Sequence, residues 1–499
     1  MDFIELPPEI SDVGARACLV CGAAGAGNHR RTAACRGPSL GGGATRVSSA
    51  TGVGHQRPRV LVIGAGFGGF HCLRTLERIL PAGAAELVAV NPSDYMLYVP
   101  LLPEVAAGSL DPRQVAVPLR SALPRTKLML GSATDIDVER QVCTIVDVEG
   151  RARSEHWDYL VLASGSVTRL LSIPGVAEHA KGFKSIAESI YLRDHILRQL
   201  QLAEQTDDPA ERAARTTFVV VGAGYTGTEV AAQGQLLAQQ ALRQHPGLHD
   251  NEIRWMLLDL APRVLPGLNP RLSKPTARVL RRRGVDVRLE TSVSEVGADY
   301  ARLTDGTEIP TRTVVWCVGV RPDPVVESLG LDTERGRVVV DDHLRVPRAD
   351  GLYAIGDVAA VPDPAQPGES TPMTAQHAQR HGETAGRNVA AALGYGEPQP
   401  YRYRPKGFVV DLGGWHGVAD PFHVPVSGPL AKVIARSYHL AALPAGKLRV
   451  AFDWLADALT ARQLVQFGLV SETGVSLREA DSVPTHGETA PAEPHAASR

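Results

Sequence analysis

Two apolar runs rich in β-branched residues are each followed by a glycine-rich turn and then by a stretch with helical spacing. The runs are residues 59–63 and 217–221, and the turns read Gly64-Ala-Gly66-Phe-Gly-Gly69 and Gly222-Ala-Gly224-Tyr-Thr-Gly227. In such a G-x-G-x-x-G turn the first glycine allows the tight turn, the second lets a pyrophosphate approach the backbone, and the third lets the helix pack on the strand. The pattern therefore predicts two Rossmann-like units, each with an anion at a helix N-terminus.

The rest of the pattern alternates strands and helices, which is typical of an α/β protein with parallel sheets. Strands are expected at 59–63, 86–90, 158–162, 217–221, 253–258, 285–289, 313–318 and 352–355, with further short strands within 127–162. Helices are expected at 68–80, 185–204, 226–243, 271–283 and 373–392. Residues 205–215 are expected to be a polar connection.

The expected fold class is α/β, with two Rossmann-like dinucleotide-binding domains and a small C-terminal α+β region that faces a membrane. Two ends rich in small and polar residues are expected to be disordered. The expected organisation is a disordered extension at 1–56, FAD-binding segments at 57–182 and 319–398, an NADH-binding domain at 183–318, a quinone- and membrane-associated region at 399–470, and a disordered tail at 471–499.

Composition narrows the function classes. The chain has 499 residues, which is long enough for two or three domains, and its formal net charge of −2 gives no reason to expect a nucleic acid partner. No window approaches the roughly 20 unbroken apolar residues of a membrane-spanning helix, although the protein could lie on a bilayer.

The six cysteines are scattered, which fits a reducing compartment. Cys18 and Cys21 form a C-x-x-C, and His29 and Cys35 could complete a metal site with them. A floppy segment is the better interpretation of this region, so no metal is expected.

Acidic residues at strand ends point to nucleotide riboses. Asp259 follows the second strand of the second unit, where an acid favours NADH because it repels the 2′-phosphate of NADPH. Arg263 lies close by and opposes that preference, and a solvated strand end is the alternative role for Asp259. Asn91 stands at the corresponding position of the first unit. Asp357 follows another apolar strand and comes directly after Gly356. It is expected either to contact a cofactor or to serve as a turn residue at the strand end.

From Arg59 to about Phe467 the chain resembles type II NADH:quinone oxidoreductases, the single-chain, non-pumping NADH dehydrogenases of respiratory chains. The motifs that carry the resemblance are the two glycine-rich turns, Tyr98-Val-Pro-Leu-Leu-Pro-Glu-Val-Ala-Ala-Gly108, Tyr159-Leu-Val-Leu-Ala-Ser-Gly-Ser-Val-Thr168, Pro262-Arg-Val-Leu-Pro266, Val315-Trp-Cys-Val-Gly-Val-Arg-Pro322, Gly356-Asp357 and Pro372-Met-Thr-Ala-Gln-His-Ala-Gln-Arg-His-Gly382. The turns and the Gly-Asp pair are common to many flavin reductases, whereas the Leu-Leu-Pro-Glu and Thr-Ala-Gln runs are narrower.

The resemblance implies hydride transfer from NADH to FAD, and then transfer of two electrons to a membrane quinone. The implied cofactor-binding residues are Gly64, Gly66, Gly69, Asn91, Ala163, Gly165, Gly319, Gly356, Asp357 and Ala375 on the FAD side, and Gly222, Gly224, Gly227 and Asp259 for NADH. The implied catalytic residues are Glu229, Gln376 and Arg380. Glu229 has been proposed in the family to take part in proton transfer, and it could equally complement the helix dipole.

The chain departs from the family at three positions. Arg380 stands where the family has a second glutamine on the quinone side, with Gln379 beside it. Asn91 replaces an acid, and Cys317 lies in a strand where a small or hydroxyl residue is usual. A guanidinium can still donate to a quinone carbonyl.

Two C-terminal stretches have amphipathic helical spacing. Residues 429–442 place Leu430, Val433, Ile434 and Tyr438 together, with Lys432 and Arg436 elsewhere on the wheel. Residues 447–462 place Leu448, Phe452, Leu455 and Leu459 on one stripe, with Trp454 nearby and Arg449 and Arg462 at the flanks. Packing in the core or against a dimer partner is the alternative, but the family uses this region for membrane attachment. We therefore expect a peripheral protein at the cytoplasmic face of the membrane, or in the cytoplasm, and a homodimer is allowed.

Other functions remain open. A ferredoxin or rubredoxin reductase shares the two-dinucleotide fold but needs a basic rim for its partner. A disulfide reductase needs a cysteine pair beside a glycine-rich turn, which the chain lacks, and sulfide:quinone chemistry would have to use Cys143 and Cys317. A redox-sensing or scaffold protein would hold FAD without turnover.

Overall fold

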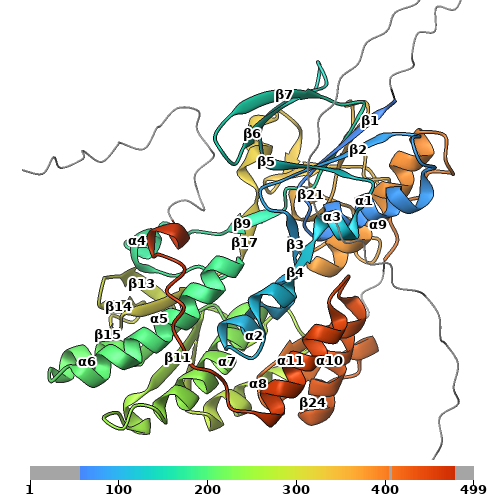
Figure 1. Cartoon of the computed structure of the whole chain (residues 1–499). Coiled ribbons are helices and arrows are strands. Elements are labelled where there is room, and N and C mark those ends of the chain that lie inside the picture. Colours follow the sequence, from blue (N-terminus) through green and yellow to red (C-terminus); the bar gives the residue numbers. More distant parts are fainter. Residues whose placement is uncertain (1–56, 404–406, 478–499) are drawn as a thin grey trace, which may run out of the picture. The chain divides into compact units, whose positions relative to one another are not determined.

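The computed structural model describes residues 57–403 and 407–477. Seven strands form the sheet that carries the first glycine-rich turn (Figure 1). In sheet order they are β20 (Leu352–Ala354), β8 (Tyr159–Leu162), β1 (Arg59–Ile63), β2 (Glu86–Asn91), β5 (Lys127–Asp137), β6 (Val142–Asp147) and β7 (Ala152–His156). The first five run parallel and the last two are antiparallel, so the sheet combines a Rossmann core with a β-hairpin edge.

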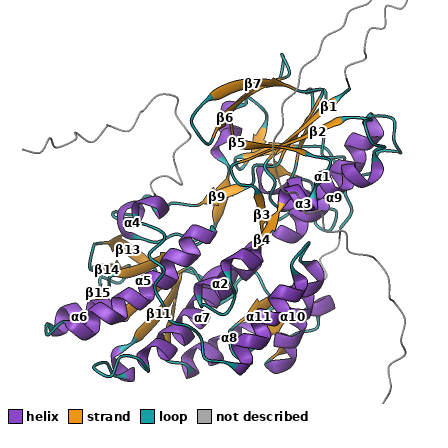
Figure 2. Cartoon of the chain, in the orientation of Figure 1, coloured by secondary structure: helices purple, strands orange, loops and turns teal. Residues whose placement is uncertain are grey.

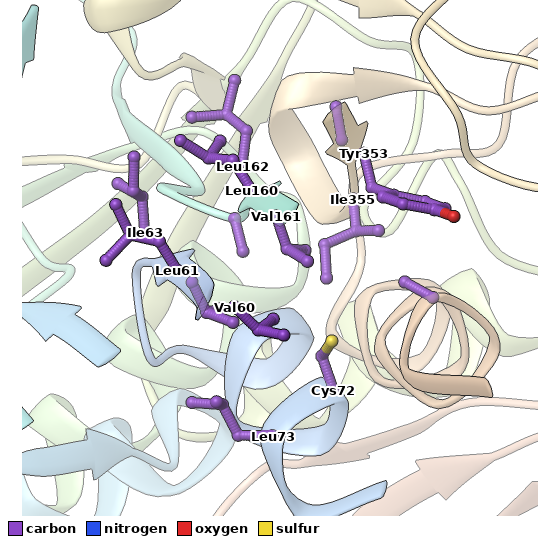
Figure 3. Packing of buried hydrophobic residues seen from close by; sticks show 14 of the residues in the cluster. Val60, Leu61, Ile63, Cys72, Leu73, Leu160, Val161, Leu162, Tyr353 and Ile355 are labelled. Atoms are coloured by element: carbon purple, nitrogen blue, oxygen red, sulfur yellow. The ribbon is translucent and has the colours of Figure 1, made fainter. Parts of the chain in front are cut away.

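Helices α1 (Phe67–Ile79) and α9 (Ala375–Ala392) pack together beside this sheet. The apolar side chains of β1 and β8 are fully buried, and Cys72 and Leu73 of α1 pack against them (Figure 3). Small residues let the two helices approach closely, because a Cβ atom on Gly382 would lie 2.1 Å from the carbonyl oxygen of Gly68. The contact fixes α9 relative to the first glycine-rich turn.

The second glycine-rich turn belongs to a separate parallel sheet of four strands. In sheet order they are β12 (Val285–Leu289), β11 (Arg254–Asp259), β10 (Thr217–Val221) and β16 (Thr313–Trp316). The helices of this unit are α5 (Ile186–Gln205), α7 (Tyr225–Leu242) and α8 (Pro270–Arg282). Phe218 stacks on Trp255 within the core, and Gly234 of α7 leaves room for that indole. The two Rossmann-type sheets confirm the expected fold class.

Smaller elements connect and extend the two sheets (Figure 2). Two strand pairs are β3 (Tyr95–Leu97) with β4 (Ala116–Pro118), and β9 (Ser166–Thr168) with β17 (Val320–Pro322). One three-stranded sheet consists of β13 (Val293–Val296), β14 (Tyr300–Leu303) and β15 (Glu308–Pro310), and another consists of β18 (Thr333–Glu334), β19 (Arg337–Val339) and β21 (Ala359–Ala360). The short helices are α2 (Leu102–Ala106), α3 (Leu119–Ala122), α4 (Val176–His179) and α6 (Pro209–Thr216). The 3₁₀ turns are η1 (Val99–Leu101), η2 (Pro112–Val115), η3 (Asp250–Glu252), η4 (Pro324–Ser328), η5 (Gly356–Val358), η6 (Pro421–His423) and η7 (Thr473–Val475).

Helix α6 corrects the expectation of a polar connection at 205–215. Asp208 caps the helix by accepting from the amide of Ala210, and Pro209 occupies its first position. The helix was missed because few of its residues are apolar, although Asp followed by Pro is itself a helix-start signal.

The C-terminal region combines a three-stranded sheet, β22 (Val409–Asp411), β23 (Gly417–Ala419) and β24 (Val426–Ser427), with helices α10 (Pro429–Ala442) and α11 (Lys447–Leu459). Both helices lie where the amphipathic spacing predicted them. The chain then continues to η7, where Leu477 is buried and Lys181 forms an ion pair with Glu472. Residues 471–477 are thus held against the protein, which corrects the expected disorder over that part of the tail. The predicted extension at 1–56, with Cys18, Cys21, His29 and Cys35, and the tail beyond residue 477 lie outside the described residues.

Candidate active site

The two glycine-rich turns have the same geometry. The first glycine has a positive φ in both turns, +89° at Gly64 and +103° at Gly222. A Cβ atom on either residue would lie 2.3 Å from a carbonyl oxygen at the end of the neighbouring strand. A Cβ atom on the middle glycine, Gly66 or Gly224, would meet nothing within 4 Å. The middle glycines therefore face open space that a ligand backbone contact can use.

The third glycine of each turn has the packing role that the fingerprint predicts. A Cβ atom on Gly69 would lie 1.8 Å from the carbonyl oxygen of Gly64, and one on Gly227 would lie 1.8 Å from that of Gly222. No side chain caps the N-terminus of α1 or α7, so the first amide groups of both helices remain available to an anion.

A cavity of about 630 Å³ opens beside the first turn. Its lining includes the predicted residues Gly64, Gly66, Asn91, Ala163, Gly165, Gly319, Gly356, Asp357 and Ala375. The hydroxyl of Ser164, also in the lining, is buried and has no hydrogen-bond partner within the described part of the chain. A cavity of this size with an open glycine-rich turn and an unpaired hydroxyl fits FAD.

Asp357 is held by a short chain of polar contacts in this cavity. The hydroxyl of Ser166 donates to Oδ2 of Asp357 at 2.6 Å, and Nζ of Lys184 donates to the Ser166 hydroxyl at 2.8 Å. Burial lowers the pKa of Lys184 to about 8, against the raising effect of Asp357 and other acids nearby. Sequence reasoning did not find Lys184, because nothing in its local pattern marks it.

The residues at the two strand ends brace the glycine-rich turns. Oδ1 of Asn91 accepts from the amide of Ala65 at 2.9 Å. Oδ2 and Oδ1 of Asp259 accept from the amides of Ala223 and Ala261. Each side chain keeps further acceptor capacity, so a bond to a ribose hydroxyl is compatible with these contacts.

Arg263 is hydrogen-bonded within the segment that follows β11. Its guanidinium donates to the carbonyls of Leu265, Pro266 and Leu268 and to the hydroxyl of Ser273. Through these contacts the arginine holds the loop after β11 together.

A second cavity of about 300 Å³ lies next to the first and shares residues with it. Phe67 at the start of α1, Thr226 at the start of α7 and Ala375 at the start of α9 all line it. Aromatic and apolar side chains form most of the remaining wall, namely Tyr98, Val99, Leu102, Phe183, Tyr225, Met373, Phe408, Val409, Tyr438 and Ala442. Both glycine-rich turns and α9 therefore converge on one largely apolar cavity.

Gln376 lines the second cavity and its amide is held on two sides. Oε1 accepts from the hydroxyl of Tyr403 at 2.8 Å, and Nε2 donates to the carbonyl of Gly407 at 3.0 Å. Tyr438 also hydrogen-bonds Gln376. Such an amide can present a donor to a carbonyl group in the cavity.

The family pattern suggested that position 380 faces the quinone, but in this chain Gln379 takes that place. Gln379 lines the second cavity, whereas Arg380 does not. Both oxygens of Glu383 accept from Nη1 of Arg380, at 2.8 and 2.9 Å, and the guanidinium also lies over the ring of Tyr403. The structure therefore directs Arg380 to an ion pair and leaves Gln379 at the cavity.

A cluster of buried charged groups lies behind the second cavity. Oε1 of Glu229 accepts from the amide of Asp411 at 2.8 Å, and Asp411 forms an ion pair with Lys432, both side chains being less than a tenth exposed. Glu104 accepts from the indole N–H of Trp454 at 2.5 Å and also hydrogen-bonds Asp411. Burial raises the pKa of Glu229 well above its usual range and that of Glu104 to about 8, and in both cases it favours the protonated carboxyl group.

Three of these groups were not predicted as site residues. Glu104 belongs to the Leu-Leu-Pro-Glu run, which could have marked it, whereas the helical spacing placed Lys432 only away from the apolar stripe. Lys432 is buried, and the apolar stripe of α10 is the exposed side, with Leu430 and Val433 more than half exposed.

The cysteines do not form a pair at the cavities. Cys317 lines the first cavity beside Gly222, whereas Cys143 lies buried on β6 and lines neither cavity. Burial raises the pKa of both thiols to about 12, which disfavours the reactive thiolate.

The fold and the two glycine-rich turns define an oxidoreductase that binds two dinucleotides. The family described as pyridine nucleotide-disulphide oxidoreductase matches residues 58–382. A type II NADH:quinone oxidoreductase of Mycobacterium tuberculosis is 31% identical over 428 residues, which cover 82% of this chain and 89% of that protein. One from Staphylococcus aureus is 28% identical over 386 residues, covering 75% and 92%.

A solved structure of NDH2 from Plasmodium falciparum in complex with NADH is similar in fold, with a TM-score of 0.76 at 17% identity over 82% of this chain and 100% of that one. The chain belongs to the pyridine nucleotide-disulphide oxidoreductase family and, within it, to the type II NADH:quinone oxidoreductases.

Proposed function

We propose that this protein oxidises NADH and reduces a membrane quinone through bound FAD, without pumping protons. The observation that carries the proposal is the convergence of the helices after both glycine-rich turns, α1 and α7, with α9 on one apolar cavity. When bound, FAD would accept a hydride from NADH and deliver two electrons to the quinone.

The residues of the chain would provide binding and alignment. Gly66 and the N-terminus of α1 would hold the FAD pyrophosphate, and Asp357 the ribityl chain. Gly224 and the N-terminus of α7 would hold NADH, with Asp259 at its ribose. Gln376 and Gln379 line the second cavity and would donate hydrogen bonds to quinone carbonyls.

Glu229 would supply a proton on the quinone side. It lines the second cavity, and burial raises its pKa well above the usual range, which favours the protonated carboxyl group that can give up a proton. The ion pair of Lys432 with Asp411 lies directly behind it and can stabilise the carboxylate that is left when the proton has gone.

Membrane attachment would use the C-terminal apolar surface, which we define as Leu430, Val433, Leu448, Phe452, Leu455 and Leu459. All six side chains are at least half exposed. None of the helices in the described ranges is long and apolar enough to cross a bilayer. The surface would lie in the membrane interface at the cytoplasmic face, and a homodimer is the competing way to cover it.

The deciding experiment measures NADH oxidation by the purified, FAD-loaded protein with and without a soluble quinone. A large increase with quinone supports the proposal. Rapid reduction of the flavin by NADH without stimulation by quinone would overturn it and favour a ferredoxin-type acceptor. Gly66→Val should lose FAD while the fold persists, since its Cβ atom has free space, whereas Gly69→Val should disturb the fold itself.

A further inference from the structure

One side of α8 carries a row of five basic residues. They are Arg271, Lys274, Arg278, Arg281 and Arg282, and all five are exposed. We call this row the α8 cationic face. The spacings of three and four residues place them on one side of the helix, opposite the buried Leu272, Thr276 and Leu280.

The charge of this face is not balanced locally. The sequence has no Asp or Glu between Leu260 and Val285, although the whole chain has a net charge of −2. Within residues 57–403 and 407–477, no ion pair joins the face to an acidic side chain, and the nearby Asp286 is paired with Arg288. Like charges three and four residues apart repel each other and destabilise an isolated helix. An anionic partner would relieve this repulsion.

A groove of about 760 Å³ runs between α8 and the loop after β11, lined by Pro262, Arg263, Lys274, Arg278 and Leu289 among others. It is not built as a site for a single phosphate, because the guanidinium of Arg263 is occupied by carbonyls and a hydroxyl. The remaining cations are exposed side chains spread along about 16 Å of helix. Such a diffuse row fits an extended anionic surface better than a soluble phosphate compound.

The C-terminal end of α8 joins the region that carries the C-terminal apolar surface. Arg283 donates to the carbonyls of Leu412 and Gly413, and the neighbouring Trp415 is 67% exposed. α8 packs against β23 and β24, and α10 packs against the same two strands. Figure 1 shows α8, β24, α10 and α11 close together.

We propose that the α8 cationic face binds the headgroups of anionic phospholipids and, with the C-terminal apolar surface, docks the protein on a negatively charged membrane. This inference rests on the proposed function, in which the quinone comes from a membrane. Basic side chains near an anionic bilayer add an attraction that salt screens, whereas apolar insertion is insensitive to salt. Docking in this way brings α10, whose Tyr438 and Ala442 line the second cavity, to the lipid.

The test is co-sedimentation of the FAD-loaded full chain with vesicles. One set contains only zwitterionic phosphatidylcholine, the other adds phosphatidylglycerol, and both are titrated with NaCl. The variant is Lys274→Glu with Arg278→Glu and Arg281→Glu. The matched control carries the same charge change at exposed arginines of the other Rossmann unit, namely Arg74→Glu, Arg78→Glu and Arg120→Glu.

We expect the wild type to bind anionic vesicles at least about tenfold more tightly than zwitterionic ones, with the difference lost at high salt. The α8 variant should lose that difference while the control keeps it, and NADH oxidation with a soluble quinone should stay unchanged in both. Equal, salt-insensitive binding to both vesicles would overturn the role of α8 and leave membrane docking intact. Binding to neither vesicle by a protein that still reduces soluble quinone would refute the docking itself. A variant that binds like the control would also overturn the proposal.

Discussion

The hydroxyl of Tyr403 donates to Oε1 of Gln376, and the same amide donates through Nε2 to the carbonyl of Gly407. Tyr403 does not line the second cavity, so in the proposed function it would act on a quinone by orienting Gln376. The amide of Gln376 is thus set in place before any quinone arrives.

Removing that hydroxyl tests this positioning role. Tyr403→Phe keeps the ring but loses one hydrogen bond, typically about 0.5–1.5 kcal/mol, so the KM for a soluble quinone should rise about 2- to 10-fold. Reduction of the flavin by NADH, followed by stopped flow, should not change. Tyr395→Phe removes a hydroxyl from a tyrosine that is 37% exposed and serves as the control. An unchanged KM in Tyr403→Phe would contradict the role.

Gln379 lines the second cavity and Arg380 does not, so substitutions at the two positions should have different effects. Gln379→Ala removes a donor from the cavity wall and should raise the quinone KM severalfold. Arg380→Gln restores the family residue and removes a partly exposed ion pair with Glu383 and the contact of the guanidinium with the ring of Tyr403. Because Arg380 does not line the second cavity, the KM should stay within about twofold. The quinone KM of both variants is measured by steady-state kinetics. A larger rise in Arg380→Gln than in Gln379→Ala would mean that Arg380 reaches the quinone.

Asp259 is expected to set the preference for NADH. Asp259→Ala removes the negative charge beside the ribose position, and the ratio of kcat/KM for NADH over NADPH should fall about tenfold, a change of ~1.4 kcal/mol. Arg263→Lys should leave the ratio unchanged but lower the thermal stability, because the guanidinium holds the loop carbonyls. Selectivity that follows Arg263 instead of Asp259 would count against this assignment.

Glu104 should make stability depend on pH. Burial, and secondarily Asp411, raise its pKa from 4.5 to about 8, so the folded state holds a proton that the unfolded chain releases. The resulting stabilisation is complete below pH 4.5 and is lost as pH rises to about 8, by up to roughly 1.4 kcal/mol per pH unit.

Glu104→Gln keeps an acceptor for the indole of Trp454 but cannot titrate. Urea unfolding of both proteins between pH 5 and pH 8 should show the wild type losing stability faster than the variant. Parallel curves would mean that Glu104 is ionised throughout this range.

The parts of the site that were predictable from sequence are those encoded locally. The glycine-rich turns, Asp259 and Asp357 each lie within a few residues of a strand, and the structure places them at strand ends as expected. The buried charge cluster joins Glu104, Glu229, Asp411 and Lys432 from four distant segments, and no local pattern brings them together.

Helix periodicity has a similar limit. It groups residues on faces but does not say which face is buried, so the spacing placed Lys432 away from the apolar stripe without predicting its burial. On α10 the basic residue is inside because Asp411 offers it a partner, while the apolar residues point outward. The same spacing on α11 left the apolar stripe outside and Trp454 buried against Glu104.

The close approach of α1 and α9 has a mechanical consequence. A Cβ atom on Gly382 would lie 2.1 Å from the carbonyl oxygen of Gly68, and one on Gly386 would lie 2.8 Å from that of Cys72. α1 begins within the first glycine-rich turn, and Gln376 is the second residue of α9. In the proposed function, FAD and the quinone would therefore be held by two helices in direct contact. The distance between the two sites would then depend on this contact, and a bulkier side chain at position 382, which lines neither cavity, would change it.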